Sequence, residues 1–213
     1  MRRIANIVEF VFNPLLVASL LLTLIYFYFP FVIAPFKNVI ILFIGLVTFL
    51  FPLISLELLK KLNIISDIFL TRKNDRLIAL ILLFLFYSVL LFLLIDNLRI
   101  NECISIILFQ IPFILFLLIL FVLVKFSIHI FSFVWANGLG ILLALSFQRQ
   151  DDVLFQPVII WILVSGVVLS SQLYLARTIY SIAYRSYVIG LIVSFLFSYY
   201  FRFIFSQFIS LFL

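Results

Sequence analysis

Long apolar runs alternate with short polar segments along the 213 residues of this chain. The runs are continuously apolar and lack the period-two alternation of barrel strands, so they favour helices. A helix needs about 20 mostly apolar residues to cross the hydrocarbon core of a membrane. Seven runs reach roughly that length, and the pattern predicts a span in each of them: 11–34, 39–59, 77–95, 103–124, 128–147, 158–176 and 187–205.

The predicted fold is therefore an all-α, multi-pass transmembrane helical bundle of about seven spans, with six as the alternative. We see no repeat, linker or second domain, and we expect residues 1–213 to form a single integral membrane domain. Small residues concentrate in the fifth and sixth spans and predict that these two pack closely as a hairpin. They are Gly138, Gly140, Ala144, Ser165, Gly166, Ser170 and Ser171.

Composition agrees with a membrane protein. Hydrophobic residues make up 68% of the chain and charged residues only 10%, against about 25% charged in soluble domains. A chain of this size cannot bury so much apolar surface internally, so a bilayer must solvate it. We expect a multi-pass protein of a bacterial cytoplasmic (inner) membrane, with membrane lipids as its first partners.

The net charge of +6 reflects topology more than a nucleic-acid partner, because no basic patch is interleaved with groove-reaching polar residues. Ten basic residues fall on the side of the N-terminus and four on the other, which together are all 14. The positive-inside rule then predicts a cytoplasmic N-terminus. Cys103 is the only cysteine, which excludes an internal disulfide, and nothing in the sequence indicates a metal or a cofactor.

The only histidine lies in the segment VKFSIHIF, residues 124–131, between two apolar runs. Odd-numbered spans begin at one membrane face and even-numbered spans end there. Three polar groups therefore emerge at that same face. One group precedes the third span, one opens the fifth, and the segment SSQLYLARTIYS closes the sixth. Cations, hydroxyls, an imidazole and a helix start in one layer suit a phosphate group.

These groups resemble the three motifs of the type 2 phosphatidic acid phosphatase superfamily, which includes haloperoxidase-like lipid phosphatases. The second motif of that family is Pro-Ser-Gly-His, and the segment FSIH keeps Ser127 and His129 at the same separation. The first motif is a lysine, six residues and Arg-Pro. Arg76 matches that arginine, and Arg72 or Lys73 would replace the lysine.

The third motif is Ser-Arg, five residues, His, three residues and Asp. Ser171 matches its serine, whereas Gln172, Thr178 and Ile182 stand at the arginine, histidine and aspartate positions. The segments VFNPLL and SQLYLA are also similar to a divergent bacterial branch of the family. The resemblance covers residues 72–182 in order, with each motif degenerate.

In that family the histidine of the third motif attacks phosphorus, the histidine of the second protonates the leaving oxygen, and cations hold the phosphoryl oxygens. The resemblance implies that His129 would be the catalytic acid. Thr178 cannot replace the nucleophile, because an unactivated hydroxyl needs a neighbouring base. The implied phosphate ligands are Arg72, Lys73, Arg76, Lys125, Ser127, Ser171 and Arg177.

The expected function is therefore that of a degenerate member that still binds a lipid phosphate headgroup. If the protein is active, it is a phosphoric monoester hydrolase with an altered mechanism. Family members carry the site on the extracytoplasmic face, whereas the charge count places it inside, so its side stays open. Two alternatives have no enzymatic activity: a membrane transporter, and a structural subunit that contacts other membrane proteins through its small-residue faces.

Overall fold

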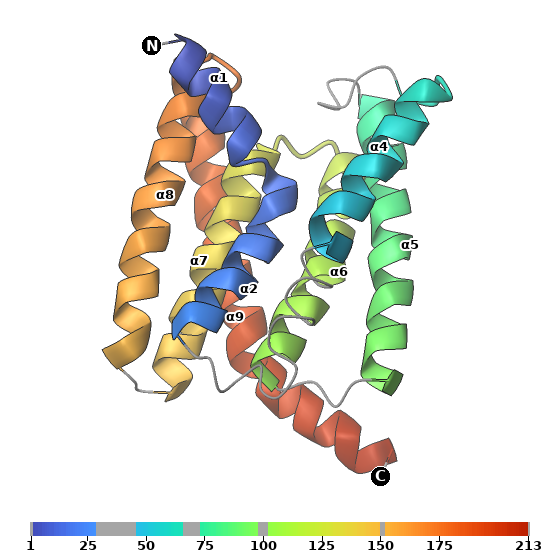
Figure 1. Cartoon of the computed structure of the whole chain (residues 1–213), viewed down its shortest axis with the longest axis vertical. Helices are drawn as coiled ribbons and strands as arrows, with labels where there is room; N and C mark the ends of the chain where they lie inside the picture. The colour runs from blue at the N-terminus through green and yellow to red at the C-terminus, as the bar shows by residue number, and fades with distance from the viewer. Residues whose placement is uncertain (1, 29–45, 66–72, 98–101, 150–151, 213) are drawn as a thin grey trace. The chain divides into compact units, whose positions relative to one another are not determined.

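The computed structural model describes residues 2–28, 46–65, 73–97, 102–149 and 152–212. These residues are helical apart from turns and contain no strand. They divide into two compact units, whose helices are labelled in Figure 1. The terminal unit comprises Met1–Phe29 and Ile128–Leu213, and the central unit comprises Pro30–Ser127.

Both units consist of helices of unequal length. The terminal unit holds α1 (Arg2–Val11), the 3-10 turn η1 (Pro14–Leu16), α2 (Val17–Tyr28), α7 (Ile130–Arg149), η4 (Asp152–Leu154), α8 (Phe155–Tyr174) and α9 (Tyr180–Phe212). The central unit holds the π-helical turn η3 (Leu46–Leu50), α4 (Phe51–Lys61), α5 (Lys73–Asn97) and α6 (Glu102–Leu123).

The predicted all-α, multi-pass membrane architecture is confirmed. Five described helices are long and apolar enough to cross a bilayer, and α2 is a shorter apolar helix. The five stretches are 74–92, 104–123, 130–148, 155–174 and 180–201. The total of seven spans stays a prediction, because residues 29–34 of the first predicted span and 39–45 of the second lie outside the described residues.

The N-terminal helix differs from the sequence prediction. The first apolar run predicts a span that begins at Val11, but helix starts at Arg2 and breaks between Val11 and Val17. Pro14, which has no backbone N–H, begins the 3-10 turn at this break. The chain therefore enters the terminal unit as two consecutive short helices, α1 and α2.

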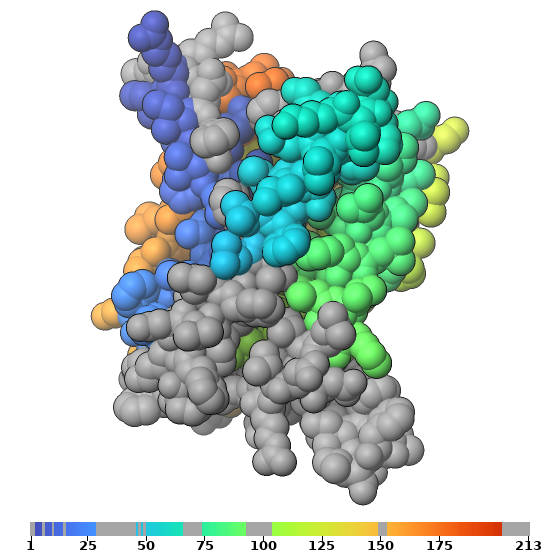
Figure 2. Space-filling model, turned by 45° about the vertical axis from the view of Figure 1, so that its right-hand side comes forward, coloured from blue at the N-terminus to red at the C-terminus, as the bar shows by residue number. Residues whose placement is uncertain are grey.

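Large apolar side chains are exposed on α4 and α5 in the central unit, and atoms of both helices form part of the face seen in Figure 2. Leu58 of α4 is 53% exposed, and Leu85 and Phe92 of α5 are 58% and 67% exposed. Monomeric soluble proteins rarely expose apolar surface of this extent, whereas a bilayer solvates it. We infer that this face contacts lipid.

Three helices end in the same backbone motif without a glycine. Asn63, Lys125 and Ala176, which follow α4, α6 and α8, have φ values of 56°, 59° and 53°. After α6, the amide of Phe126 donates to the carbonyl of Phe121 at 2.9 Å, and the two rings lie 5.5 Å apart. This is the Schellman arrangement, which satisfies the last carbonyls of a helix. It fixes the direction of the chain immediately after each helix.

The core of the terminal unit is the contact between α7 and α9, which run parallel. Ser186, Gly190, Ser194 and Ser198 recur every four residues on one face of α9, and all four are buried. A Cβ atom on Gly190 would lie 2.5 Å from the carbonyl oxygen of Phe133 in α7. Small residues at this spacing let the two backbones approach closely, as in membrane helix pairs.

The predicted hairpin of the fifth and sixth spans is correct for only part of α7. Gly138 packs directly against the ring of Trp161 in α8. Gly140 faces α9 instead, where its Cβ would meet the carbonyl oxygen of Leu191 at 2.7 Å. A Cβ atom on Gly166, which lies on the outer face of α8, would meet nothing within 4 Å. The small residues of α7 therefore serve two neighbours, and the contact with α9 is the more extensive.

We expect Gly140→Ala to lower the stability of the protein by about 1–3 kcal/mol, because the added methyl group must displace the backbone of α9. Gly166→Ala is the matched control, since its methyl group meets no neighbour. It should leave stability unchanged or raise it by up to about 1 kcal/mol. Thermal unfolding in detergent measures both, and equal effects would contradict the close α7–α9 contact.

Candidate functional site

The sequence-predicted residues gather at one end of each unit. In the terminal unit, α7 and α9 begin where α8 ends (Figure 1), so one end carries His129, Ser171, Gln172, Arg177, Thr178 and Ile182. In the central unit, α5 packs against α6 and runs antiparallel to it, so one end carries Lys73, Arg76, Lys125 and Ser127. Arg72 lies outside the described residues.

His129 immediately precedes α7 and caps that helix. Its Nδ1 lies 2.8 Å from the hydroxyl of Ser132 and 3.4 Å from the backbone N–H of the same residue. Because an N–H group can only donate, Nδ1 is the acceptor, and a neutral ring then carries its proton on Nε2. The backbone N–H of His129 donates to the hydroxyl of Ser186 at 2.9 Å. The histidine therefore has a structural role at the α7–α9 contact.

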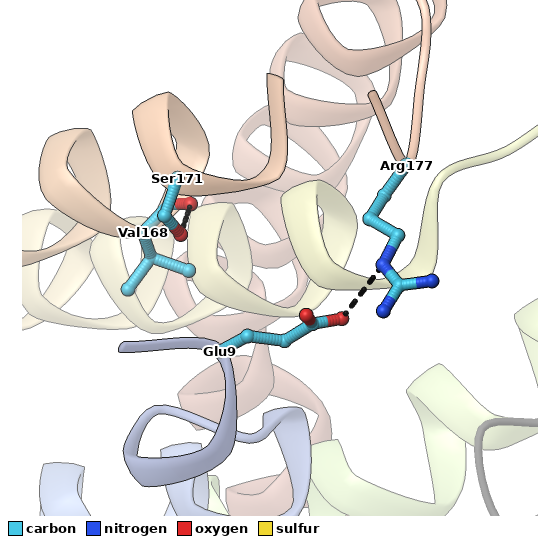
Figure 3. A network of polar contacts seen from close by, with 4 residues as sticks. All are labelled: Glu9, Val168, Ser171 and Arg177. Atoms are coloured by element: carbon cyan, nitrogen blue, oxygen red, sulfur yellow. Dashed lines mark hydrogen bonds and ion pairs between the residues drawn. The ribbon is translucent and has the colours of Figure 1, made fainter. Parts of the chain in front are cut away.

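Arg177 pairs with an acidic residue that the sequence analysis did not single out. Its Nε lies 3.4 Å from Oε1 of Glu9, which extends from α1 (Figure 3). The Glu9 side chain is only 8% exposed, whereas that of Arg177 is 53% exposed. A buried carboxylate needs such a partner. The sequence signal that could have revealed Glu9 was an acidic residue within an otherwise apolar helix face, shortly before Asn13 and Pro14.

The Schellman turn after α8 places Arg177 at the end of the unit. Its backbone N–H donates to the carbonyl of Gln172 at 3.1 Å, and Ala176 adopts the left-handed conformation between them. A cation just beyond a helix C-terminus also complements the negative end of the helix dipole. The guanidinium has five N–H donors, and its half-exposed position leaves part of it accessible.

Ser171 and Gln172 point into the protein. The hydroxyl of Ser171 donates to the carbonyl of Val168 at 2.7 Å (Figure 3). Gln172 is 1% exposed, and its Nε2 has no hydrogen-bond partner among the described residues. A buried amide N–H group without a hydrogen-bond partner lowers the stability of the folded protein by about 1–3 kcal/mol. At the position that the resemblance matches to the arginine of the third motif, the chain thus has a buried neutral side chain.

The resemblance would place Thr178 and Ile182 at the nucleophile and aspartate positions of that motif. The hydroxyl of Thr178 lies 3.4 Å from the carbonyl of the next residue, Ile179. The carbonyl of Ile182 accepts a hydrogen bond from the hydroxyl of Ser186 at 2.7 Å. Neither residue provides a base or an imidazole, so this pair cannot form a phosphohistidine.

The predicted cations of the central unit have different surroundings. Lys125 is exposed and forms the left-handed turn after α6, followed by the exposed Ser127. Arg76 is half-buried in the first turn of α5, next to the buried Asp75. An acidic residue in a first turn complements the helix dipole. Lys73 begins α5.

Exposed tyrosines mark two levels along the terminal unit. Tyr174, Tyr180 and Tyr184 lie at the end that carries Arg177, and they are 59%, 69% and 62% exposed. Tyr199 and Tyr200 are exposed farther along α9. From Tyr180 to Tyr200, α9 rises roughly 30 Å, about the thickness of the hydrocarbon core. Tyrosines concentrate at membrane–water interfaces, so these residues indicate that Arg177 lies at headgroup level.

Among the described residues, no group of three or more His, Cys, Asp and Glu side chains could hold a metal ion. Comparison of the chain with known protein families, curated proteins and solved structures finds no match. The resemblance to lipid phosphate phosphatases therefore stays a prediction from the motifs.

We expect His129→Ala to lower the stability of the protein by about 1 kcal/mol, because α7 loses its cap. His129→Asn keeps a side-chain acceptor at the cap position and should unfold close to the wild-type temperature. Thermal unfolding of the two variants in one detergent measures the difference. An alanine variant as stable as the asparagine variant would contradict the capping role.

Proposed function

We propose that this integral membrane protein binds a phosphate-bearing lipid headgroup at the end of α8 and does not hydrolyse it by the family mechanism. The observation that carries the proposal is the position of Arg177. Its guanidinium is half-exposed at the level of the exposed tyrosines near the end of α8. Glu9 approaches it at a single 3.4 Å contact. Guanidinium groups bind phosphate oxygens through paired, charge-assisted hydrogen bonds.

The surroundings of Arg177 support binding at the membrane surface. Arg185 lies in the second turn of α9, near the same end, and is exposed, which adds positive charge to the layer. Glu9 is buried behind Arg177 and limits the directions that the guanidinium can take. A lipid headgroup reaches this level without crossing the membrane, so the site needs no internal cavity.

The absence of family-type hydrolysis follows from two side chains. Thr178 stands at the nucleophile position without a base, and Gln172 is buried at the arginine position. Binding needs only charge at the right level, whereas phosphoryl transfer also needs a nucleophile held in line.

Two substitutions should change headgroup affinity in opposite directions. Arg177→Gln removes the charge-assisted hydrogen bonds and should weaken the binding of short-chain phosphatidic acid by about tenfold or more. Glu9→Gln keeps an oxygen that can accept from Nε but removes the negative charge beside the ligand. We expect it to tighten binding several-fold, up to about tenfold. Ligand-dependent thermal stabilisation of the detergent-purified protein measures both affinities.

Lys61→Gln is the matched control for charge, because Lys61 is an exposed basic residue at the end of α4 in the other unit. It should bind phosphatidic acid like the wild type. If Arg177→Gln and Lys61→Gln bind equally well, Arg177 is not the headgroup ligand. A stable, stoichiometric protein partner without any lipid effect would favour the structural-subunit alternative.

We further expect no phosphate release from a panel of lipid phosphates, since the nucleophile is absent. The release of inorganic phosphate is measured for the wild type beside His129→Asn, which preserves the cap of α7. Release that disappears in this variant would show a histidine-dependent phosphatase. It would overturn the non-catalytic part of the proposal and leave the headgroup site at Arg177 to be judged by the binding data.

A further inference from the structure

Helix α1 is amphipathic in a way that the long spans are not. Ile4, Ile7 and Val11 follow one another at helical spacing, and they are 65%, 61% and 48% exposed. Ala5 and Glu9, on the opposite face, are 7% exposed each. The helix thus buries its acidic residue and turns an apolar row outward, the reverse of a helix on a soluble protein.

The position of α1 is fixed at two points within the terminal unit. Its inner face packs against α8, a candidate span, and Glu9 pairs with Arg177 beyond the end of α8. At the break that follows α1, the indole N–H of Trp135 donates to the carbonyl of Phe12 at 3.2 Å, and the two rings lie 5.7 Å apart edge to face. The outward direction of the apolar row is therefore set by the protein.

The charges of α1 favour one kind of environment for that outer face. Arg2 and Arg3 begin the helix, and the Arg3 side chain is exposed one turn from Ile7. Glu9 is the only acidic residue in the helix, and Arg177 neutralises it on the inner side. Basic residues beside an apolar row are typical of helices that insert at the surface of anionic membranes. In Figure 2 the dark blue atoms of α1 lie at the surface.

We propose that α1 is a lipid-contacting arm, with Ile4, Ile7 and Val11 among the acyl chains of one leaflet and Arg3 at the phosphates of anionic lipids. The alkyl stem of Arg3 can lie along the helix while its guanidinium reaches the headgroups. The partner surface is the anionic bilayer itself. This inference does not depend on the phosphate site proposed at Arg177.

The test uses a fluorescent NBD label on single cysteines in a Cys103→Ser background, with the full chain in lipid vesicles. One labelled variant is Ile7→Cys and the reference is Leu163→Cys, on the outer face of the candidate span α8, where Leu163 is 65% exposed. Quenching by nitroxide on lipid acyl chains reports contact with lipid, and quenching by iodide reports contact with water. We expect the label at position 7 to be quenched by nitroxide lipids and protected from iodide, like the reference.

The preference for anionic lipid is measured on the same label with headgroup-labelled nitroxide lipids in mixed phosphatidylcholine and phosphatidylglycerol vesicles. Nitroxide phosphatidylglycerol should quench more strongly than nitroxide phosphatidylcholine. Arg3→Gln should lower the ratio of phosphatidylglycerol quenching to phosphatidylcholine quenching by up to about fivefold, the factor that one basic residue near an anionic surface contributes. Lys61→Gln should leave this quenching ratio unchanged.

Two results would overturn the proposal as a whole, and a third would overturn its anionic preference. Strong iodide quenching at position 7, with the reference protected, would show that the apolar row faces water. Protection from both quenchers, together with energy transfer between differently labelled copies that is lost on dilution with lipid, would show that a second copy of the chain covers the row. A label in lipid with equal quenching by the two headgroup-labelled lipids would overturn the anionic preference.

Discussion

The close contact between α7 and α9 determines the arrangement of the terminal unit. Two parallel helices can approach to backbone distance only where side chains are small, and α9 supplies Ser186, Gly190, Ser194 and Ser198 on one face. The hydroxyl of Ser194 donates to the carbonyl of Asn137 at 2.7 Å across this contact. Since α8 must return the chain between two parallel helices, the contact brings the start of α7, the end of α8 and the start of α9 to one level.

The same contact explains why polar side chains are buried in this unit while large apolar side chains face outward. Ser186, Ser194 and Ser198 are fully buried, whereas Leu163 on the outside is 65% exposed. In a bilayer the exterior gains nothing from polarity, and buried hydroxyls are stable when backbone carbonyls accept their protons. Hydroxyls engaged in this way hold helices together.

Hydropathy predicted the membrane helices well, because transfer of apolar side chains to lipid dominates the energetics of a span. It could not predict α1, in which Arg2, Arg3 and Glu9 keep the helix outside the apolar run. Glu9 was missed for the same reason, and its partner Arg177 lies near the other end of the chain. The small residues of α7 predicted a close contact correctly, but small size alone does not specify which helix fills the space. Gly138 meets α8, and Gly140, two residues later, meets α9.

The motif positions predicted which residues lie at one end of the terminal unit, but they did not predict the burial and hydrogen bonds of each side chain. Spacing along a helix determines level, so His129, Ser171 and Arg177 do share an end. Burial depends on rotation about the helix axis and on neighbours, and it places Gln172 inside while Arg177 stays at the boundary. The Schellman turn after α8 fixes where that helix ends, and it therefore holds Arg177 at the level that the proposed headgroup site requires.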